Sequence, residues 1–352
     1  MKTKTPQFRL TSRSRNFRFD LNRGKGHLLS YIKNRIRWHL FPRLHHVSKF
    51  PSHVDIELSS LCNLSCPMCY TTTDKFKTKV KRGNMDFDLY KKIIDECVKY
   101  NLYSIRLSLR GEAFLNEHIY EMIKYAKDKG IKEVSSLTHG GLIDEKNFEQ
   151  LIDLKLDWLT ISFDGVGETY DKIRYPLKFE DSVKKIKNYQ KIKKQKNVKK
   201  PIIKVQTVWP AISENPDEFY NTFNPITDQV ASNPLLDYLG NDTNVVFEEN
   251  FTCPQLWERL VIGADGNVML CANDEMESHI LGNVNKESLY KIWHGEKLND
   301  AREIHTKHLG VQKIDACKHC YLPRKMESGS TKVGDHFVKI DKYMNREQSV
   351  GK

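Results

Sequence analysis

The residues best suited to chemistry are three cysteines within eight positions, in the stretch LCNLSCPMCY (residues 61–70). Cys62, Cys66 and Cys69 have the spacing C-x3-C-x2-C and account for three of the eight cysteines in the chain. Three thiolates can bind three irons of a [4Fe–4S] cubane and leave the fourth iron open. An open metal position is typical of a catalytic site rather than a structural one. A zinc site is the alternative, but it needs a fourth nearby ligand, and the nearest histidine, His53, precedes the cysteines.

Four further cysteines form a second set with the spacings C-x17-C and C-x2-C: Cys253, Cys271, Cys317 and Cys320. Four thiolates can saturate either one cubane cluster or a structural zinc ion, and the spacing alone does not separate the two. The eighth cysteine, Cys97, falls on the apolar face of an expected helix. We interpret it as a buried core thiol, with a hydrogen-atom donor as the alternative.

The elements that must position these cysteines alternate between β-rich apolar runs and segments of helical period. Strands are expected at 54–58, 104–109, 133–138, 158–163 and 202–209, with a weaker one near 228–236. Helices are expected between them: 86–99 with Asp86 as its cap, Asn116 to Gly130, 144–154 and 179–195. Repeated βα units predict a parallel sheet with right-handed crossovers. The three-cysteine loop then lies at the carboxyl ends of the strands, where such sheets place their active sites.

The pattern changes after about residue 250. The segment 253–271 predicts a β-hairpin that turns at Asp265-Gly266, and helices are expected at 286–294 and 297–308. We therefore divide the chain into an N-terminal extension, a core, a small cysteine-bearing domain and a tail, at 1–50, 51–250, 251–325 and 326–352. The lysine-rich segment 183–200 is interpreted as a solvated helix face, and no nucleic-acid site is expected.

The positive charge of the chain is concentrated at its start. Residues 1–50 contain thirteen Lys or Arg and one acid, Asp20, and so carry the whole net charge of +12. Within them, an expected helix places Leu28, Leu29, Ile32, Ile36 and Leu40 near one face. We favour a helix packed on the body with a solvated basic face, and peripheral contact with an anionic membrane surface is the alternative. No spanning helix and no secretory leader are expected, so the predicted location is the cytoplasm, where thiols stay reduced.

The three-cysteine loop resembles the signature of the radical S-adenosylmethionine (AdoMet) superfamily. In that family AdoMet chelates the open iron, and its reductive cleavage gives a 5′-deoxyadenosyl radical that abstracts hydrogen from a substrate. The resemblance spans about residues 54–325 and implies AdoMet contacts from seven residues: Met68, Gly111, Glu112, Thr138, Ser162, Asp164 and Arg174. Two neighbours of Glu112 depart from the family's Gly-Gly-Glu-Pro pattern, Arg110 and Ala113. The implied fold is a partial (β/α)6 TIM-like barrel in the α/β class, followed by a small α+β iron–sulfur domain.

The second cysteine set resembles the SPASM/Twitch extension of the same superfamily, in its shorter form with one fully ligated auxiliary [4Fe–4S] cluster. The resemblance implies two clusters and a flavodoxin- or ferredoxin-type reductant. The favoured activity is oxidation of a small molecule such as a sugar, cyclitol or nucleotide sugar, with the auxiliary cluster as electron acceptor. A peptide or protein maturase is the second candidate, and a non-catalytic electron carrier the third. No catalytic base can be named from the sequence.

Overall fold

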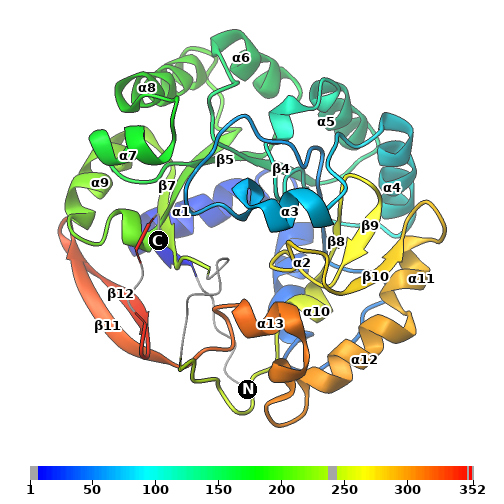
Figure 1. The fold of residues 1–352 in the computed structure, drawn as a ribbon. Coiled ribbons are helices and arrows are strands. Elements are labelled where there is room, and N and C mark those ends of the chain that lie inside the picture. The colour runs from blue at the N-terminus through cyan, green and yellow to red at the C-terminus, as the bar shows by residue number, and fades with distance from the viewer. Residues whose placement is uncertain (1–6, 237–243, 347–348, 351–352) are drawn as a thin grey trace.

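The computed structural model describes residues 7–236, 244–346 and 349–350. Its centre is a curved sheet of ten strands, with helices around the outside (Figure 1). Six strands run parallel in chain order, each beside the next: β2 (His53–Ile56), β3 (Ser104–Arg106), β4 (Glu133–Thr138), β5 (Trp158–Ser162), β6 (Ile202–Val208) and β7 (Gln229–Asn233). The predicted strands and the partial (β/α)6 barrel are confirmed, including the weak sixth strand.

The helices of this part follow the strands and bury their apolar faces against the sheet. They are α3 (Asp74–Lys79), α4 (Phe87–Lys99), α5 (Ile119–Asp128), α6 (Glu145–Asp153), α7 (Glu168–Ile173), α8 (Phe179–Gln195) and α9 (Pro216–Phe223). Cys97 is fully buried on α4, which confirms its interpretation as a core thiol.

Local capping explains where these helices begin. Asp86 caps α4 as predicted, since its carboxylate accepts from the amides of Asp88 and Leu89 at 2.9 and 3.1 Å. The predicted start of α5 at Asn116 is wrong, because that helix begins at Ile119. The buried side-chain amide of Asn116 instead donates to the carbonyls of Leu58 and Met85, which ties the turn to the first strand.

The C-terminal part continues the same sheet. β8 (Arg259–Ile262) pairs in parallel with β2, and β9 (Asn267–Met269) and β10 (Ile280–Asn283) follow in antiparallel order. β8 and β9 form the predicted hairpin, and Gly266 in its turn has φ +87°. The remaining helices are α10 (Gln255–Glu258), α11 (Leu289–Trp293), α12 (Glu296–His305) and α13 (Asp315–His319). The change expected near residue 250 is thus a change of strand direction, with no break in the sheet.

Two features at the ends of the chain were not predicted. The segment named a tail contains an antiparallel hairpin, β11 (Met326–Val333) and β12 (His336–Tyr343). Near the start, β1 (Phe8–Arg9) pairs antiparallel with β7 and so extends the sheet by one strand. Residues 7–9 are therefore part of the barrel wall.

The two N-terminal helices, α1 (Arg13–Gly24) and α2 (Leu28–Leu40), cover the amino ends of the strands and lie behind the sheet in Figure 1. Arg23 donates two hydrogen bonds to Glu133, Phe19 packs on Trp158, and Trp38 packs on His53. Each of these partners is the first residue of a parallel strand. The prediction that the extension packs on the body is confirmed.

The packed side of α2 is, however, a different side from the predicted one. The buried residues of this helix are Tyr31 and Asn34. All five members of the predicted apolar face are exposed: Leu28, Leu29, Ile32, Ile36 and Leu40. The expected burial of that face is wrong, because aromatic and ionic contacts hold the helices to the barrel instead.

Candidate functional site

The cysteine loop follows β2 and is held against the loop after β3. The amide of Glu112 donates to the carbonyl of Leu61 at 2.7 Å, so the two loops touch through their backbones. Gly111 is required at this crossing, because a Cβ there would lie 2.3 Å from the Leu61 carbonyl oxygen and 2.5 Å from that of Ser59. The departure of Arg110 and Ala113 from the family pattern leaves this glycine and the glutamate in place.

The three thiols of the loop differ in exposure: Cys62 is exposed, Cys69 is partly buried and Cys66 is buried. Burial raises the pKa of Cys66 to about 11 and also raises the pKa of Cys62. The thiols of Cys62 and Cys66 therefore keep their protons at neutral pH in the metal-free chain, and bound iron would displace them.

Glu112 lies at the centre of a buried hydrogen-bond network. Its carboxylate accepts from the Thr138 hydroxyl at 2.9 Å, the His139 amide at 2.9 Å and the Phe114 amide at 3.1 Å. Burial nevertheless raises its pKa, because the desolvation outweighs these bonds. His139 in turn bonds Asn63 of the cysteine loop at 2.8 Å. Two residues predicted from separate strands, Glu112 and Thr138, are thus joined directly, and His139 links them to the cysteines.

Asp164 and Arg174 form a buried ion pair next to the same loop. The Arg174 Nε donates to the Asp164 Oδ2 at 3.0 Å, and a second guanidinium nitrogen also bonds that oxygen. The other oxygen of Asp164 accepts from the Val208 amide at 2.9 Å and the Thr207 hydroxyl at 3.2 Å. Burial lowers the pKa of Arg174, but attraction to Asp164 and Cys66 outweighs it, so the pKa lies above its usual value. Both carboxylate oxygens are engaged by protein donors, which fixes the guanidinium beside Cys66.

Arg110 connects the core to the C-terminal part. Its guanidinium bonds both carboxylate oxygens of Glu57, at 2.7 and 2.6 Å, and reaches Glu277 at 2.7 Å. The side chains of Arg110 and Glu57 are 1% and 0% exposed. Glu57 also accepts from the Ala264 amide at 3.0 Å, in the β8–β9 turn. In the sequence Arg110 stands out only as a departure from the family pattern, and no local signal there predicts this role.

The second cysteine set comes together in the C-terminal part. All four side chains are buried: Cys253, Cys271, Cys317 and Cys320. Burial, and next the nearby sulfurs of the same set, raise the pKa of Cys253, Cys271 and Cys317. Burial raises the pKa of Cys320 to about 11. Four converging soft sulfur donors fit an iron–sulfur cluster. Within the described ranges, no group of three or more His, Cys, Asp or Glu side chains was found that could hold a single metal ion.

Two polar residues contact this cysteine set and were not predicted. The Asn273 side chain donates to the Cys320 sulfur at 3.3 Å. The His305 Nδ1 accepts from the Cys253 amide at 3.4 Å, and its Nε2 lies 3.4 Å from the Cys317 sulfur. Burial lowers the pKa of His305 to about 4, so the ring is neutral and its single proton is on Nε2, facing the sulfur.

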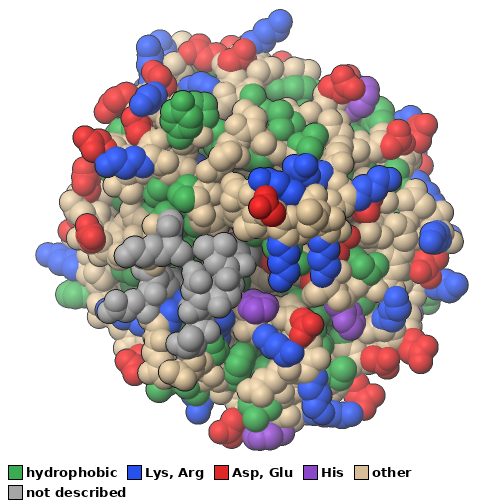
Figure 2. Space-filling model, viewed as in Figure 1, with side chains coloured by type: hydrophobic (Ala, Val, Ile, Leu, Met, Phe, Trp, Pro, Cys, Tyr) green, Lys and Arg blue, Asp and Glu red, His purple; other side chains and the backbone are tan. Residues whose placement is uncertain are grey.

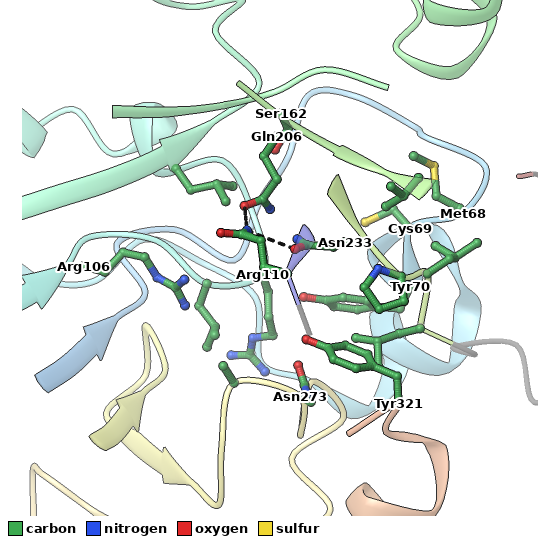
Figure 3. Close-up of a pocket in the computed structure, with 18 of the residues that line it drawn as sticks. Met68, Cys69, Tyr70, Arg106, Arg110, Ser162, Gln206, Asn233, Asn273 and Tyr321 are labelled. Carbon is green, nitrogen blue, oxygen red and sulfur yellow. Dashed lines mark hydrogen bonds between the residues drawn. The ribbon is translucent and has the colours of Figure 1, made fainter. Parts of the chain in front are cut away.

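A cavity of about 570 Å³ reaches from the three-cysteine loop to residues that neighbour the second cysteine set in the chain. It is lined by all three loop cysteines and by most of the predicted AdoMet contacts: Met68, Gly111, Glu112, Ser162, Asp164 and Arg174. Thr138 does not line it, and acts through Glu112. The other side of the cavity is made by residues next to Cys271 and Cys320, namely Ala272, Asn273, Tyr321 and Leu322. Figure 3 shows Cys69, Ser162, Asn273 and Tyr321 around this space.

The middle of the cavity is lined by polar side chains. The Gln7 amide donates to Gln206 at 2.8 Å and to Asn233 at 3.0 Å, the two bonds drawn in Figure 3. Lys204 donates to the oxygen of the same Gln7 amide at 2.6 Å. Arg106 also lines the cavity and pairs with Asp55 at 2.8 Å. No motif in the sequence marks these residues, because they come from β3, β6, β7 and the residue before β1, and only the folded sheet brings them together.

Comparison with known proteins identifies two domains. Residues 56–222 match the radical SAM superfamily, and residues 253–321 match an iron–sulfur cluster-binding domain of the SPASM type. The chain is 24% identical over 323 residues to the tungsten-containing aldehyde ferredoxin oxidoreductase cofactor-modifying protein of Pyrococcus furiosus, covering 76% of this chain and 86% of that one. It is 21% identical over 282 residues to the S-adenosyl-L-methionine-dependent 2-deoxy-scyllo-inosamine dehydrogenase of Niallia circulans, covering 78% and 94%.

Two solved structures share the fold. BtrN in complex with AdoMet and 2-DOIA superposes with a TM-score of 0.55 at 18% identity, covering 78% of this chain and 94% of that one. Streptococcus suis SuiB bound to the precursor peptide SuiA superposes with a TM-score of 0.55 at 13% identity, covering 84% and 76%. At these identities the likeness concerns the fold. One structure was solved with a small molecule and the other with a peptide.

Proposed function

Because the chain belongs to the radical SAM superfamily and carries an iron–sulfur cluster-binding domain after its core, it is a radical SAM enzyme that uses AdoMet and [4Fe–4S] clusters, and we propose that it oxidises a hydroxyl group of a polar small molecule. The observation that carries this proposal is the single cavity that touches the cysteine loop on one side and the neighbours of Cys271 and Cys320 on the other. A substrate held in this cavity lies between the site of hydrogen abstraction and a second set of cysteines that can take up an electron.

The proposal assigns the predicted residues as follows. Cys62, Cys66 and Cys69 hold the cluster that binds AdoMet, and Cys253, Cys271, Cys317 and Cys320 hold the auxiliary cluster. The AdoMet contacts come from Met68, Gly111, Glu112, Ser162, Asp164 and Arg174, with Thr138 holding Glu112 in place. The electron for AdoMet cleavage comes from a cytoplasmic flavodoxin- or ferredoxin-type protein.

The polar middle of the cavity favours a small hydroxylated substrate, such as a sugar, cyclitol or nucleotide sugar. Amide side chains from Gln206 and Asn233 can both donate and accept hydrogen bonds, as vicinal hydroxyl groups require. Arg106 adds a fixed positive charge at the same cavity. The 21% identity to a dehydrogenase over 78% of the chain agrees with this substrate class.

The oxidation can be balanced with groups that the cavity offers. Bound AdoMet and the reduced cluster supply the radical that removes a hydrogen atom from the carbon that bears the hydroxyl. The hydroxyl proton would then pass to a base, and a cluster held by Cys253, Cys271, Cys317 and Cys320 would accept the remaining electron, so that the C–O bond becomes a carbonyl. Glu258 lines the cavity, and no hydrogen bond or ion pair joins its carboxyl group to another described residue. Burial raises its pKa to about 7, which suits a proton acceptor at neutral pH.

The test is anaerobic incubation of the reconstituted chain with reductant, AdoMet and a panel of polyols, cyclitols and nucleotide sugars. The expected products are 5′-deoxyadenosine and, for the true substrate, a carbonyl compound that has lost two hydrogens. Replacing the three loop cysteines with Ala should abolish 5′-deoxyadenosine. Replacing the four C-terminal cysteines should lower iron from about eight to about four per chain and remove the oxidised product, while AdoMet cleavage persists. Persistence of AdoMet cleavage without the loop cysteines would refute the assignment.

A peptide or protein maturase is the second candidate, supported by the shared fold with peptide-bound SuiB. It predicts no turnover of any small molecule in the panel and 5′-deoxyadenosine formation that depends on an added peptide. A non-catalytic electron carrier is the third candidate, and it predicts no 5′-deoxyadenosine at all. The cavity between the cysteine sets favours the enzyme, since a carrier needs no enclosed substrate space.

A further inference from the structure

The outer surface of α1 and α2 carries an unusual concentration of exposed apolar side chains. Of the twelve large apolar residues exposed in the described part of the chain, eight lie between Phe17 and Leu44. They are Phe17, Leu21, Leu28, Leu29, Ile32, Ile36, Leu40 and Leu44, and we call this set the N-terminal apolar stripe. Leu29 is 84% exposed and Ile36 is 56% exposed. Stripes of this kind mark interaction sites rather than ordinary surface.

The stripe is continuous along α2. Ile32, Ile36 and Leu40 are spaced four residues apart, so they follow one another along one side of the helix. Together with Tyr31, Arg35 and His39 they line a shallow open groove. The inner side of the same helix is already occupied by the barrel, because Tyr31 and Asn34 are buried there. The stripe therefore has no partner among the described residues.

The charge around the stripe indicates what covers it. Arg13, Arg18, Lys25, Lys33 and Arg37 are exposed on the same two helices and their connection. The single acid of residues 1–50, Asp20, is paired with Arg9 at 3.0 Å. The rest of the chain has no net charge, since residues 1–50 carry the full +12. Apolar side chains flanked by exposed cations match the interface of an anionic bilayer, where the cations meet phosphate groups and the apolar stripe enters the acyl boundary.

We propose that α1 and α2 dock this protein on the surface of an anionic phospholipid membrane. No described helix is long and apolar enough to cross a bilayer. The exposed apolar side chains follow one side of α2, so this helix can lie along the lipid surface. The inner side of α1 and α2 covers the amino ends of the strands. Their outer side, the docking surface, therefore lies on the side of the molecule opposite the cysteine loop (Figure 1). Figure 2, which views the opposite side from these helices, shows apolar side chains scattered among charged ones of both signs.

The docking surface also adjoins the central cavity. His39 lines both the groove on α2 and the cavity, and Trp38 and Pro42 line the cavity beside it. A membrane-bound molecule would therefore hold one end of its cavity close to the lipid surface. Docking does not depend on the reaction proposed above, because it rests on residues outside the cysteine loop.

The test is flotation of the full reconstituted chain with vesicles of phosphatidylcholine alone or mixed with phosphatidylglycerol. Binding should favour the anionic vesicles at least about tenfold at low salt and fall at about 0.5 M salt. The double variant Lys33→Glu/Arg37→Glu should weaken it by at least about tenfold, since each basic residue near the surface contributes about 1 kcal/mol, a factor of about five. Leu29→Ser/Ile36→Ser should weaken binding to a similar degree.

Matched controls come from elsewhere on the surface. Lys187→Glu/Lys191→Glu makes the same charge change on the exposed side of α8, and Phe337→Ser removes a side chain that is 75% exposed on β12. Both should leave flotation unchanged. Equal loss in the α8 variant, equal binding to neutral vesicles, or no binding to anionic vesicles would each overturn the proposal. Concentration-dependent dimers in sedimentation equilibrium that disappear in Leu29→Ser/Ile36→Ser would also overturn it, because the stripe would then be covered by a second copy of the chain.

Discussion

Replacing Arg110 with Met should destabilise the whole molecule, because it leaves a charge buried without its partner. The Glu57 carboxylate has no exposure, and Arg110 contacts both of its oxygens, so the variant leaves this carboxylate with only amide donors. Breaking a buried pair by removing one partner costs about 3–5 kcal/mol. With about 2.1 cal/mol/K of unfolding entropy per residue over 352 residues, that cost corresponds to a fall in Tm of about 4–7 °C.

The assay is thermal unfolding of the reconstituted protein under anaerobic conditions, followed by circular dichroism. Two matched variants define the cause. Arg110→Met/Glu57→Leu removes both charges and should recover most of the lost Tm, since a buried pair replaced by apolar groups is close to neutral. Lys124→Met breaks the pair with Asp128, whose side chains are both more than 60% exposed, and should change the Tm by no more than about 1 °C. A double variant as unstable as Arg110→Met alone would show that the loss comes from packing or from Glu277, and the reasoning from an uncompensated Glu57 charge would be refuted.

Three further outcomes are expected. Glu258→Gln should raise the free energy of unfolding by about 3 kcal/mol at pH 8 and by about 1 kcal/mol at pH 5. Burial raises the pKa of the Glu258 carboxyl to about 7, so the carboxyl favours folding while it is protonated and loses that contribution as the pH rises through 7. Urea titrations at both pH values check this, and an equal gain at both would contradict it. His305→Phe should lower the reduction potential of the auxiliary cluster, since it removes an N–H that faces the Cys317 sulfur. An anaerobic redox titration followed by electron paramagnetic resonance measures the potential, and an unchanged value would show that His305 only fills space. Gly111→Ala should abolish AdoMet binding measured by equilibrium dialysis, because the added methyl group would displace the Leu61 carbonyl. Gly83→Ala, where a Cβ has open space, should bind AdoMet normally. Equal AdoMet binding by both variants would refute the close-contact argument.

The parts of the molecule that follow local rules were predictable from the sequence. The six parallel strands, the Asp86 cap and the position of the cysteine loop after β2 depend on periodicity, capping and order within short stretches, and the structure agrees with these three. The α5 start at Asn116 failed because residues 116–118 form a turn before the helix, in which the Asn116 side chain accepts from the His118 amide and also donates to the carbonyl of Leu58. Local preference and tertiary demand compete at such positions, and the sequence does not show which of them wins.

The missed site residues failed for a different reason. Gln7, Gln206 and Asn233 are common polar residues separated by up to 226 positions, and nothing in their local context relates them. The apolar pattern of α2 was recognised, but hydrophobic periodicity alone cannot show whether a face turns toward the protein or away from it. That direction was decided by Tyr31, Trp38 and Arg23, whose ring and ionic contacts hold the opposite side of the helices to the strand ends.

The pairing of β1 with β7 has a consequence for biosynthesis. Phe8 lies opposite Ser232 in the sheet, so during translation this segment finds its partner only after more than two hundred further residues have been added. At about 5–20 residues per second, that interval lasts roughly 10–45 s. Throughout it, Gln7 cannot take its place beside Gln206 and Asn233, and the interior of the barrel lacks part of its wall. The nascent chain is thus open to solvent at the future cavity for tens of seconds, and Gln7, although synthesised before the parallel strands, is among the last residues to close it.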